Sequence, residues 1–140
     1  MTITVEAYRD AHFEGVRSLW LEAFPDDPPH NRAEVAIPAK LAVQPDLLLV
    51  AVDGDVVVGT AMAGYDGHRG WLYSVAVRQT HRRRGIATLL IADAEQRLAR
   101  LGCTKANLQV RAENAAVTAL YRSLGYEIEE RVSMGKRLPS

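Results

Sequence analysis

The sequence predicts a mixed α/β domain in which a single sheet carries helices packed on its faces. Two observations predict this fold class. Runs of apolar and β-branched residues, typical of strands, alternate with segments whose apolar residues recur every three or four positions, which is typical of helices. An Asp-Gly pair also joins two strand-like runs, as in a β-hairpin. The chain has 140 residues, so we expect residues 1–140 to form a single domain.

The chain begins with a predicted strand and a predicted amphipathic helix. Residues 3–7 alternate apolar and polar side chains, which is typical of a half-buried strand. From Phe13 to Phe24 apolar residues recur at helical spacing, so one face of this helix is expected to pack against the sheet. We expect Asp10 to cap the helix. The proline-rich turn at 25–29 should end it, because proline cannot continue the hydrogen-bond ladder.

A second helix and a hairpin are predicted next. Residues 35–41 predict a short helix capped by Asn31, with Pro38 inside it. Residues 47–52 and 56–63 are apolar runs rich in valine, and the Asp-Gly sequence between them predicts a tight turn. These two runs are therefore expected to pair as an antiparallel hairpin.

The middle of the chain predicts a strand, a loop and the longest helix. Residues 70–77 form another strand-like run. From Ile86 to about Leu101 the apolar residues keep helical spacing, and Gly102 stands where glycine commonly ends a helix. A further strand is predicted at 106–110.

The C-terminal segment predicts one more helix and two short strands. Asn114 is a candidate cap for a helix over 115–124, which Gly125 would end. Residues 126–132 and 133–138 are predicted to form a final pair of strands.

Composition excludes several classes of protein. Lysine plus arginine and aspartate plus glutamate both number 17, and this zero net charge argues against a polybasic nucleic-acid binder. A single cysteine, Cys103, forms neither an intrachain disulfide nor a cysteine-rich zinc site, so we expect no metal. No secretory signal and no apolar run of spanning length is present, so we expect a cytoplasmic monomer or homodimer without a membrane partner.

The segment from Val75 to Ala87 carries the strongest indication of function. A predicted strand runs through a short loop into a helix N-terminus, whose first backbone N–H groups lack intrahelical partners. These groups favour anions, diphosphates especially, and the small Gly85 and Ala87 would let a phosphate approach the backbone. Cationic donors stand beside them: His81, Arg82, Arg83 and Arg84. The alternatives are a merely solvated loop or a weak nucleic-acid patch.

Two motifs resemble those of the GNAT superfamily of N-acetyltransferases. Arg82-x-x-Gly85-x-Ala87, placed directly after a predicted strand, resembles the family's acyl-CoA signature. The stretch from Asn114 to Tyr126 is similar to the family's second conserved block. The order of the predicted elements matches the family as well.

The resemblance implies a single mixed, mostly antiparallel sheet flanked by about four helices. It also implies an enzyme that moves an acetyl group from acetyl-CoA to an amine by direct attack in a ternary complex. The amine could belong to a small molecule, a protein N-terminus or a lysine. Tyr121 would be catalytic and protonate the leaving thiolate, and a backbone N–H at a bulge beside Val75 would stabilise the thioester oxygen. The implied cofactor-binding residues are Val75, Ala76, Val77, Arg82, Arg83, Arg84, Gly85, Ile86, Ala87 and Asn114.

The sequence does not identify a general base. Relatives carry a base where this chain has Gln109 or Trp71, and neither side chain is a proton acceptor at neutral pH. Asp66, His68 and Tyr73 are nearby in sequence, although Asp66 and His68 could instead shape their loop.

The amine is expected to enter beside the first two helices, the loop between them and the hairpin end near residues 64–70. Trp20, Phe24, Asp26 and Asp27 are candidates for this pocket, where two carboxylates would attract a cationic amine. The alternative is a proline-rich turn with solvated aspartates.

Two other functions remain open. A non-catalytic acyl-CoA sensor or interaction module would use the same fold, and the missing base favours it. A small RNA-binding protein would use the arginines from Arg82 to Arg84, but zero net charge and few aromatic residues near that cluster count against it.

Overall fold

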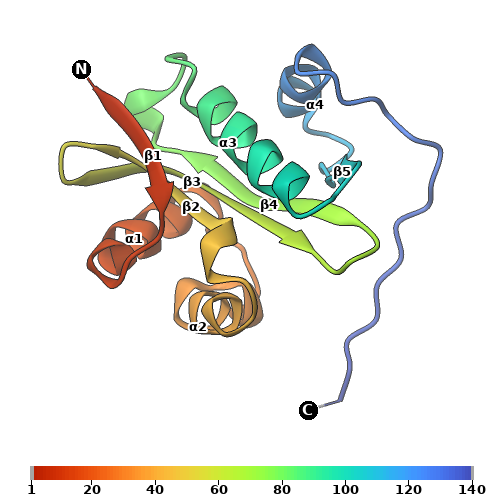
Figure 1. The fold of residues 1–140 in the computed structure, drawn as a ribbon, viewed down its shortest axis with the longest axis horizontal. Coiled ribbons are helices and arrows are strands. Elements are labelled where there is room, and N and C mark those ends of the chain that lie inside the picture. The colour runs from red at the N-terminus through yellow and green to blue at the C-terminus, as the bar shows by residue number, and fades with distance from the viewer. Residues whose placement is uncertain (1, 140) are drawn as a thin grey trace. The chain divides into compact units, whose positions relative to one another are not determined.

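The computed structural model describes residues 2–139 and contains one five-stranded sheet (Figure 1). Its strands follow the chain order and are antiparallel, except that β4 and β5 are parallel. The strands are β1 (Ile3–Ala7), β2 (Leu48–Asp53), β3 (Val56–Tyr65), β4 (Gly70–Val77) and β5 (Ala106–Asn107). The helices are α1 (Phe13–Ala23), α2 (Ala33–Val43), α3 (Ile86–Arg100) and α4 (Ala115–Ser123). The predicted mixed, mostly antiparallel sheet with four helices is confirmed.

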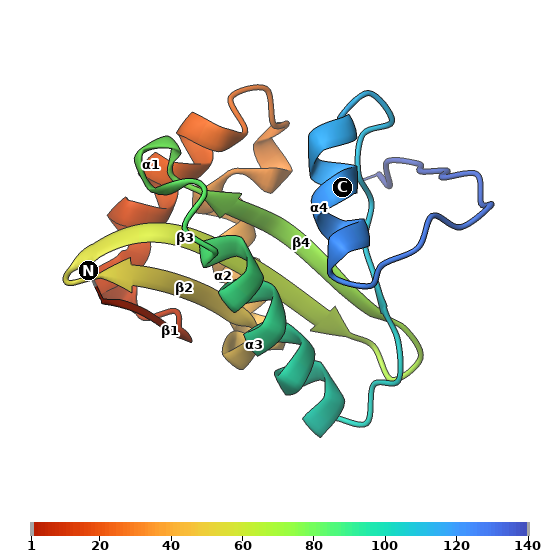
Figure 2. The same ribbon diagram turned by 90° about the horizontal axis from the view of Figure 1, so that it is seen from above.

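Helices cover both faces of the sheet in the first part of the chain. Figures 1 and 2 show α1 and α2 on one face and α3 on the other. Alternate β2 residues, Leu48 and Val50, pack into the cluster that α1 and α2 contribute to, and Leu49 between them is equally buried. A strand buried on both faces has apolar residues in succession, which explains the unbroken apolar run. A Cβ on Gly59 of β3 would lie only 2.9 Å from Leu90 of α3, so glycine lets this helix approach the sheet.

Contacts divide the chain at Leu108 into two compact units. The first unit holds the sheet, α1, α2 and α3. The second holds α4, where the side chain of Asn114 accepts a hydrogen bond from the N–H of Val117 as predicted for an N-cap. Within this unit the rings of Tyr121 and Tyr126 meet edge to face with centroids 5.6 Å apart.

Two predicted caps are wrong because short 3-10 turns precede the helices. Asp10 begins a 3-10 turn that ends at His12, and His12 is the residue that precedes α1. Asn31 ends another such turn, so Arg32 stands at the N-cap of α2. A pattern of apolar residues marks the helix itself but does not reveal a tight turn joined to its start.

The predicted strands at 126–132 and 133–138 are also wrong, and β5 is shorter than predicted. Within the described residues this tail forms no strand, and its apolar side chains Ile128, Val132 and Met134 are exposed. Alternation alone predicts a strand only where a partner strand is available for pairing. No helix in the described range 2–139 is long and apolar enough to cross a membrane.

Candidate functional site

The strand β4 contains a β-bulge next to its centre. Between the β3 residues Thr60 and Met62 the register shifts, so that one residue of β3 faces two residues of β4, Ser74 and Val75. Ser74 has φ of 49°, a left-handed conformation that is uncommon for a residue with a side chain. The predicted bulge beside Val75 is therefore present, and it changes the direction of the backbone N–H and C=O groups at this point of the strand.

A buried hydrogen-bond relay holds this bulge. The hydroxyl of Thr60 donates to the carbonyl of Ser74 at 2.9 Å and accepts from Nε1 of Trp20 at 2.9 Å. Thr60 has no solvent exposure and Trp20 is 4% exposed. Helix α1 is thus connected through β3 to the strained residue of β4, and each polar group has a partner.

Most of the outer edge of β4 has no strand beside it within the first unit. The strand β5 pairs with Gly70 and Trp71 only. From Leu72 to Val77, β4 is bonded to β3 on one side, and no described strand of this unit pairs with its other side. Backbone groups on such an edge can pair with an extended ligand, as in β-augmentation. The predicted contact residues Val75, Ala76 and Val77 all belong to this stretch.

The loop after β4 leads directly into the N-terminus of α3. Gly85 has φ of 74° and a Cβ built on it would meet nothing within 4 Å, so the space beside this turn is open. The backbone N–H of Leu89 bonds to the carbonyl of Gly85, and the N–H groups before it, at Ile86 and Ala87, belong to the first turn of the helix. Arg83, with φ of 64°, supplies a second left-handed turn. The loop therefore brings two left-handed residues next to the open N-terminus of α3, an arrangement that can bind an anion.

Arg78 anchors one end of this loop. Its guanidinium donates to the carbonyls of Val57 at 2.8 Å and Gly15 at 3.0 Å. A carboxylate oxygen of Glu22 accepts from the N–H of Gln79 at 2.9 Å. These bonds tie the loop to α1 and β3, so its conformation is set by the protein in advance.

The predicted cationic donors fall into two groups. The ring of His81 lies 3.1 Å from the carboxylate of Asp53 and 2.8 Å from the hydroxyl of Thr80, so both ring nitrogens have protein partners. His81 therefore braces the loop and is not available as an anion donor. By contrast, three consecutive side chains are exposed around the turn: Arg82, Arg83 and Arg84.

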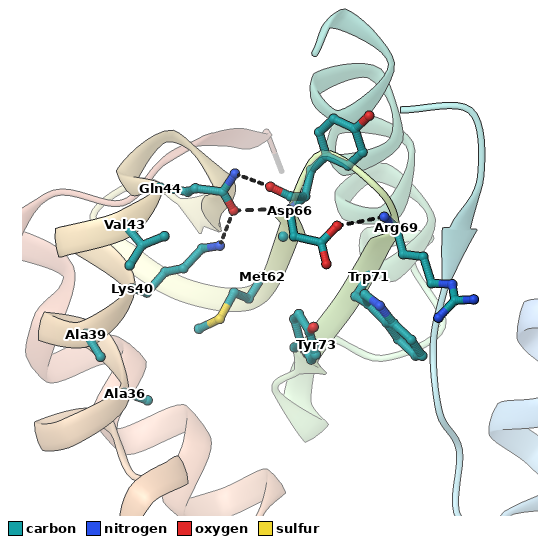
Figure 3. Close-up of a pocket in the computed structure, with 12 residues that line it drawn as sticks. Ala36, Ala39, Lys40, Val43, Gln44, Met62, Asp66, Arg69, Trp71 and Tyr73 are labelled. Atoms are coloured by element: carbon teal, nitrogen blue, oxygen red, sulfur yellow. Dashed lines mark hydrogen bonds between the residues drawn. The ribbon is translucent and has the colours of Figure 1, made fainter. Parts of the chain in front are cut away.

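A pocket of about 440 Å³ opens between α2 and the β3–β4 hairpin (Figure 3). Its α2 wall is mainly apolar, and Trp71 and Tyr73 of β4 form the opposite wall with their rings stacked at 6.5 Å. Three charged side chains also line it, two cationic and one acidic: Lys40, Arg69 and Asp66. Along β4 the lining of this pocket ends at Tyr73, which immediately precedes the bulge residue Ser74.

Three side chains that line the pocket, Asp66, Tyr73 and Lys40, have shifted pKa values. The N–H groups of Arg69 and His68 donate to one oxygen of Asp66, at 2.7 and 2.8 Å, and these bonds lower the pKa of that carboxyl. Asp66 therefore shapes the loop, as the alternative interpretation held, and is a weak base. Burial raises the pKa of Tyr73, so its hydroxyl stays protonated. Burial lowers the pKa of the half-buried Lys40 ammonium.

The second unit carries the residues of the second motif. Burial raises the pKa of the Tyr121 hydroxyl, which therefore keeps its proton above its ordinary range. Asn114 is exposed and caps α4 through its carbonyl oxygen. Gln109 donates to the hydroxyl of Ser133 at 2.7 Å, and it offers no proton acceptor of basic character.

Of the residues named from the sequence, Asp66, Trp71 and Tyr73 line this pocket, whereas its lining residues on α2 were not predicted. Trp20 is in the core, while Phe24 and Asp27 line a smaller hollow between α1 and α2. Lys40 and Thr60 were not predicted. Each had a weak signal. Lys40 is the only charged residue in the predicted helix 35–41, and Thr60 carries a hydroxyl inside an apolar strand.

Comparisons with known proteins agree with this geometry. The sequence model of the Acetyltransferase (GNAT) family matches residues 11–126. An acetyltransferase of Sodalis glossinidius is 44% identical over 135 residues, which cover 96% of this chain and 94% of that protein. The solved aminoglycoside N-acetyltransferase in complex with CoA has a TM-score of 0.79 at 24% identity, covering 97% of this chain and 95% of that one. A chain of the NatC complex bound to Gag peptide and CoA has a TM-score of 0.77 at 25% identity, covering 89% and 84%.

Proposed function

Because this chain belongs to the GNAT family of acetyltransferases, we propose that it transfers an acetyl group from acetyl-CoA to a primary amine, by direct attack in a ternary complex. One observation carries the proposal: a bulged strand with an unpaired edge leads straight into an open helix N-terminus. On this proposal residues 1–140 act together as one catalytic domain. CoA bound to a structural relative 25% identical to this chain supports the choice of cosubstrate.

The residues of the first unit fit acetyl-CoA. The N–H groups from Arg83 to Ala87 would hold the diphosphate, since they combine the helix dipole with an open approach beside Gly85, whereas the N–H of Arg82 donates to the carbonyl of Gln79. The exposed arginine side chains would add charge-assisted bonds. The edge backbone from Val75 to Val77 would pair with the amide groups of the pantetheine arm in the manner of an added strand. Asn114 would contact the same arm through its amide N–H₂, which α4 capping leaves unused.

The bulge would act on the thioester oxygen. A backbone N–H re-aimed at Ser74 or Val75 would donate to this oxygen as negative charge builds on it. The attacking nitrogen forms a C–N bond to the acetyl carbon while the C–S bond breaks. The nitrogen releases one proton to water, the departing sulfur receives one proton from the Tyr121 hydroxyl, and the tyrosinate regains a proton from water. The Tyr121 hydroxyl is protonated at neutral pH, as a general acid must be, and burial raises its pKa further.

The attacking amine must be neutral, and no strong base lines the pocket within the described residues. Releasing the proton of a lysine-like amine with a pKa of about 10.4 costs roughly 4–5 kcal/mol at pH 7, whereas an α-amine near 8 costs about 1 kcal/mol. We place the acceptor in the pocket between α2 and the hairpin, because the lining residue Tyr73 immediately precedes the bulge. The absence of a strong base favours acceptors with a low amine pKa.

The test combines binding with turnover. We expect CoA and acetyl-CoA to raise the melting temperature of the protein clearly, and ATP and NAD to raise it much less. We also expect free thiol to appear from acetyl-CoA when small amines are supplied. If ATP raised the melting temperature as much as acetyl-CoA does, the site would bind phosphate groups in general and not acetyl-CoA in particular. Strong binding of acetyl-CoA without thiol release for any amine would indicate the sensor function instead.

A further inference from the structure

We propose that the pocket between α2 and the hairpin accepts a small amine that carries a carboxylate and an apolar or aromatic body, and that Lys40 binds the carboxylate. This inference rests on the amine acetylation proposed above and names the class of acceptor. An aromatic α-amino acid represents the class.

Lys40 is a positioned cation without an acidic partner. Its Nζ donates to Oε1 of Gln44 at 3.3 Å and to the carbonyl of Ala63. These acceptors are neutral, and among the described residues no carboxylate lies within 4.0 Å of Nζ. A half-buried ammonium bonded to neutral groups alone retains uncompensated charge, and its third N–H remains for an incoming anion.

The position of Lys40 is set by a second clamp. Gln44 donates from Nε2 to the carbonyl of Tyr65 at 2.8 Å and accepts from the N–H of Tyr65 at 3.2 Å. Helix α2 is thereby fastened to the end of β3, and Lys40, one turn earlier on the helix, is directed toward the hairpin (Figure 3). A preorganised cation of this kind loses little side-chain entropy when it binds an anion.

The aromatic wall supplies the other half of the specificity. Trp71 and Tyr73 stack with an interplanar angle of 22°, and Figure 3 shows them across the pocket from Lys40. A Cβ built on Gly64 would lie 3.7 Å from Nζ of Lys40 and 3.4 Å from the ring of Tyr73. The space over Gly64 is therefore bounded by the cation on one side and the ring on the other, and it suits a ligand with a carboxylate and an apolar group.

Charge argues against polycationic acceptors in the same place. The lining contains two cations, Lys40 and Arg69, and one carboxylate, Asp66. One oxygen of Asp66 already accepts from two loop N–H groups, so its charge is partly compensated. A polyamine or a lysine-rich peptide would bring further positive charge into this surrounding, whereas a zwitterion would bring its own anion.

The test uses matched amines with acetyl-CoA and measures released thiol. L-phenylalanine and 2-phenylethylamine share a ring and an amine and differ in the carboxylate, glycine lacks the ring, and spermidine is polycationic. We expect phenylalanine to have the lowest KM. Lys40→Met should raise the KM for phenylalanine by about tenfold to a hundredfold, which corresponds to the loss of one charge-assisted hydrogen bond. The KM for 2-phenylethylamine should stay within about twofold of the wild-type value.

Control variants separate recognition from folding. Lys40→Arg keeps the cation and should restore part of the preference for phenylalanine, while Lys136→Met removes an exposed charge of the tail and should change neither KM. Gly64→Ala meets only ordinary contacts, so it should fold and still raise the KM for phenylalanine by narrowing the space. Equal effects of Lys40→Met on both amines, or a wild-type preference for spermidine or 2-phenylethylamine, would overturn the inference and leave amine acetylation standing. Acetyl-CoA binding without turnover of any amine would overturn both.

Discussion

The loop before α3 and the pocket beside α2 belong to the same unit but are built from different atoms. The loop offers backbone N–H groups, so its requirements fall on consecutive positions: a left-handed glycine at Gly85 and a helix that begins at Ile86. The pocket offers side chains from α2, β3 and β4, and its Lys40 and Ala63 are 23 positions apart. A backbone site leaves a contiguous motif, whereas a side-chain site does not. This is why the cosubstrate could be predicted and the acceptor could not.

The largest effect is expected for Gly85→Glu, which places a charged side chain beside the backbone N–H groups of the loop. A carboxylate beside the first N–H groups of α3 would repel a diphosphate and fill the open approach. Acetyl-CoA binding, measured by calorimetry, should fall below detection. Gly102→Glu is the matched control, because Gly102 has φ of 92° at the other end of α3 and a Cβ there also meets nothing within 4 Å. If both variants lost binding to a similar extent, the loss would come from backbone strain at a left-handed position and not from a blocked anion site.

Tyr121→Phe should reduce turnover by about a hundredfold, with acetyl-CoA affinity little changed. The reduction is expected at the low end of general acid catalysis, because a thiol pKa of about 8.5 makes the thiolate a fair leaving group. Since burial raises the pKa of Tyr121, wild-type turnover should show no loss from its ionisation up to about pH 10.

Tyr8→Phe, which removes the hydroxyl of another buried tyrosine, is the control for loss of packing. Wild-type turnover in Tyr121→Phe would leave Tyr121 as a packing residue and would favour the sensor function.

A smaller effect on turnover is expected for Thr60→Val, which removes the hydroxyl that links Trp20 to the bulge residue Ser74. Nε1 of Trp20 would lose its acceptor in a buried position, which costs about 1–3 kcal/mol of stability. The carbonyl of Ser74 would lose its donor, so turnover should fall roughly tenfold while acetyl-CoA affinity stays within about twofold. Thr4→Val on the exposed face of β1 is the control. A variant that loses stability but keeps turnover would show that chemistry does not depend on the bulge.

The smallest effect concerns stability and pH at Lys40. Because burial lowers the pKa of Lys40 in the folded state, the unfolded chain binds more protons between that value and the ordinary lysine pKa of about 10.4. Wild-type stability should therefore rise relative to Lys40→Met as pH increases through this interval. Urea unfolding of both proteins in parallel measures the difference and cancels the tyrosines, which also titrate there. A difference that declines with pH would show that Lys40 is stabilised as a cation by the fold.

Much of the architecture could be predicted because local signals agree with tertiary packing. The Asp-Gly turn fixes the β2–β3 hairpin, and the positive φ of Gly102 ends α3 next to its predicted last residue. The predicted strand at 70–77 coincides with β4, because its aromatic and β-branched residues favour extended backbone and it pairs with β3 along its length. The prediction of C-terminal strands was wrong for the opposite reason. Apolar and polar residues alternate over 126–138, but no strand of the described structure pairs with this segment.

The sequence by itself determined the family, the Asn114 cap of α4 and the glycine that follows α3, because each depends on a few neighbouring residues. Only the tertiary structure decided that Thr60 bonds to Ser74, that His81 bonds to Asp53 and that Lys40 lines one pocket with Trp71 and Tyr73. These contacts join residues far apart in the chain. The free energy of such contacts comes from burial and from hydrogen bonds formed after the sheet and helices have packed, so no local pattern records them.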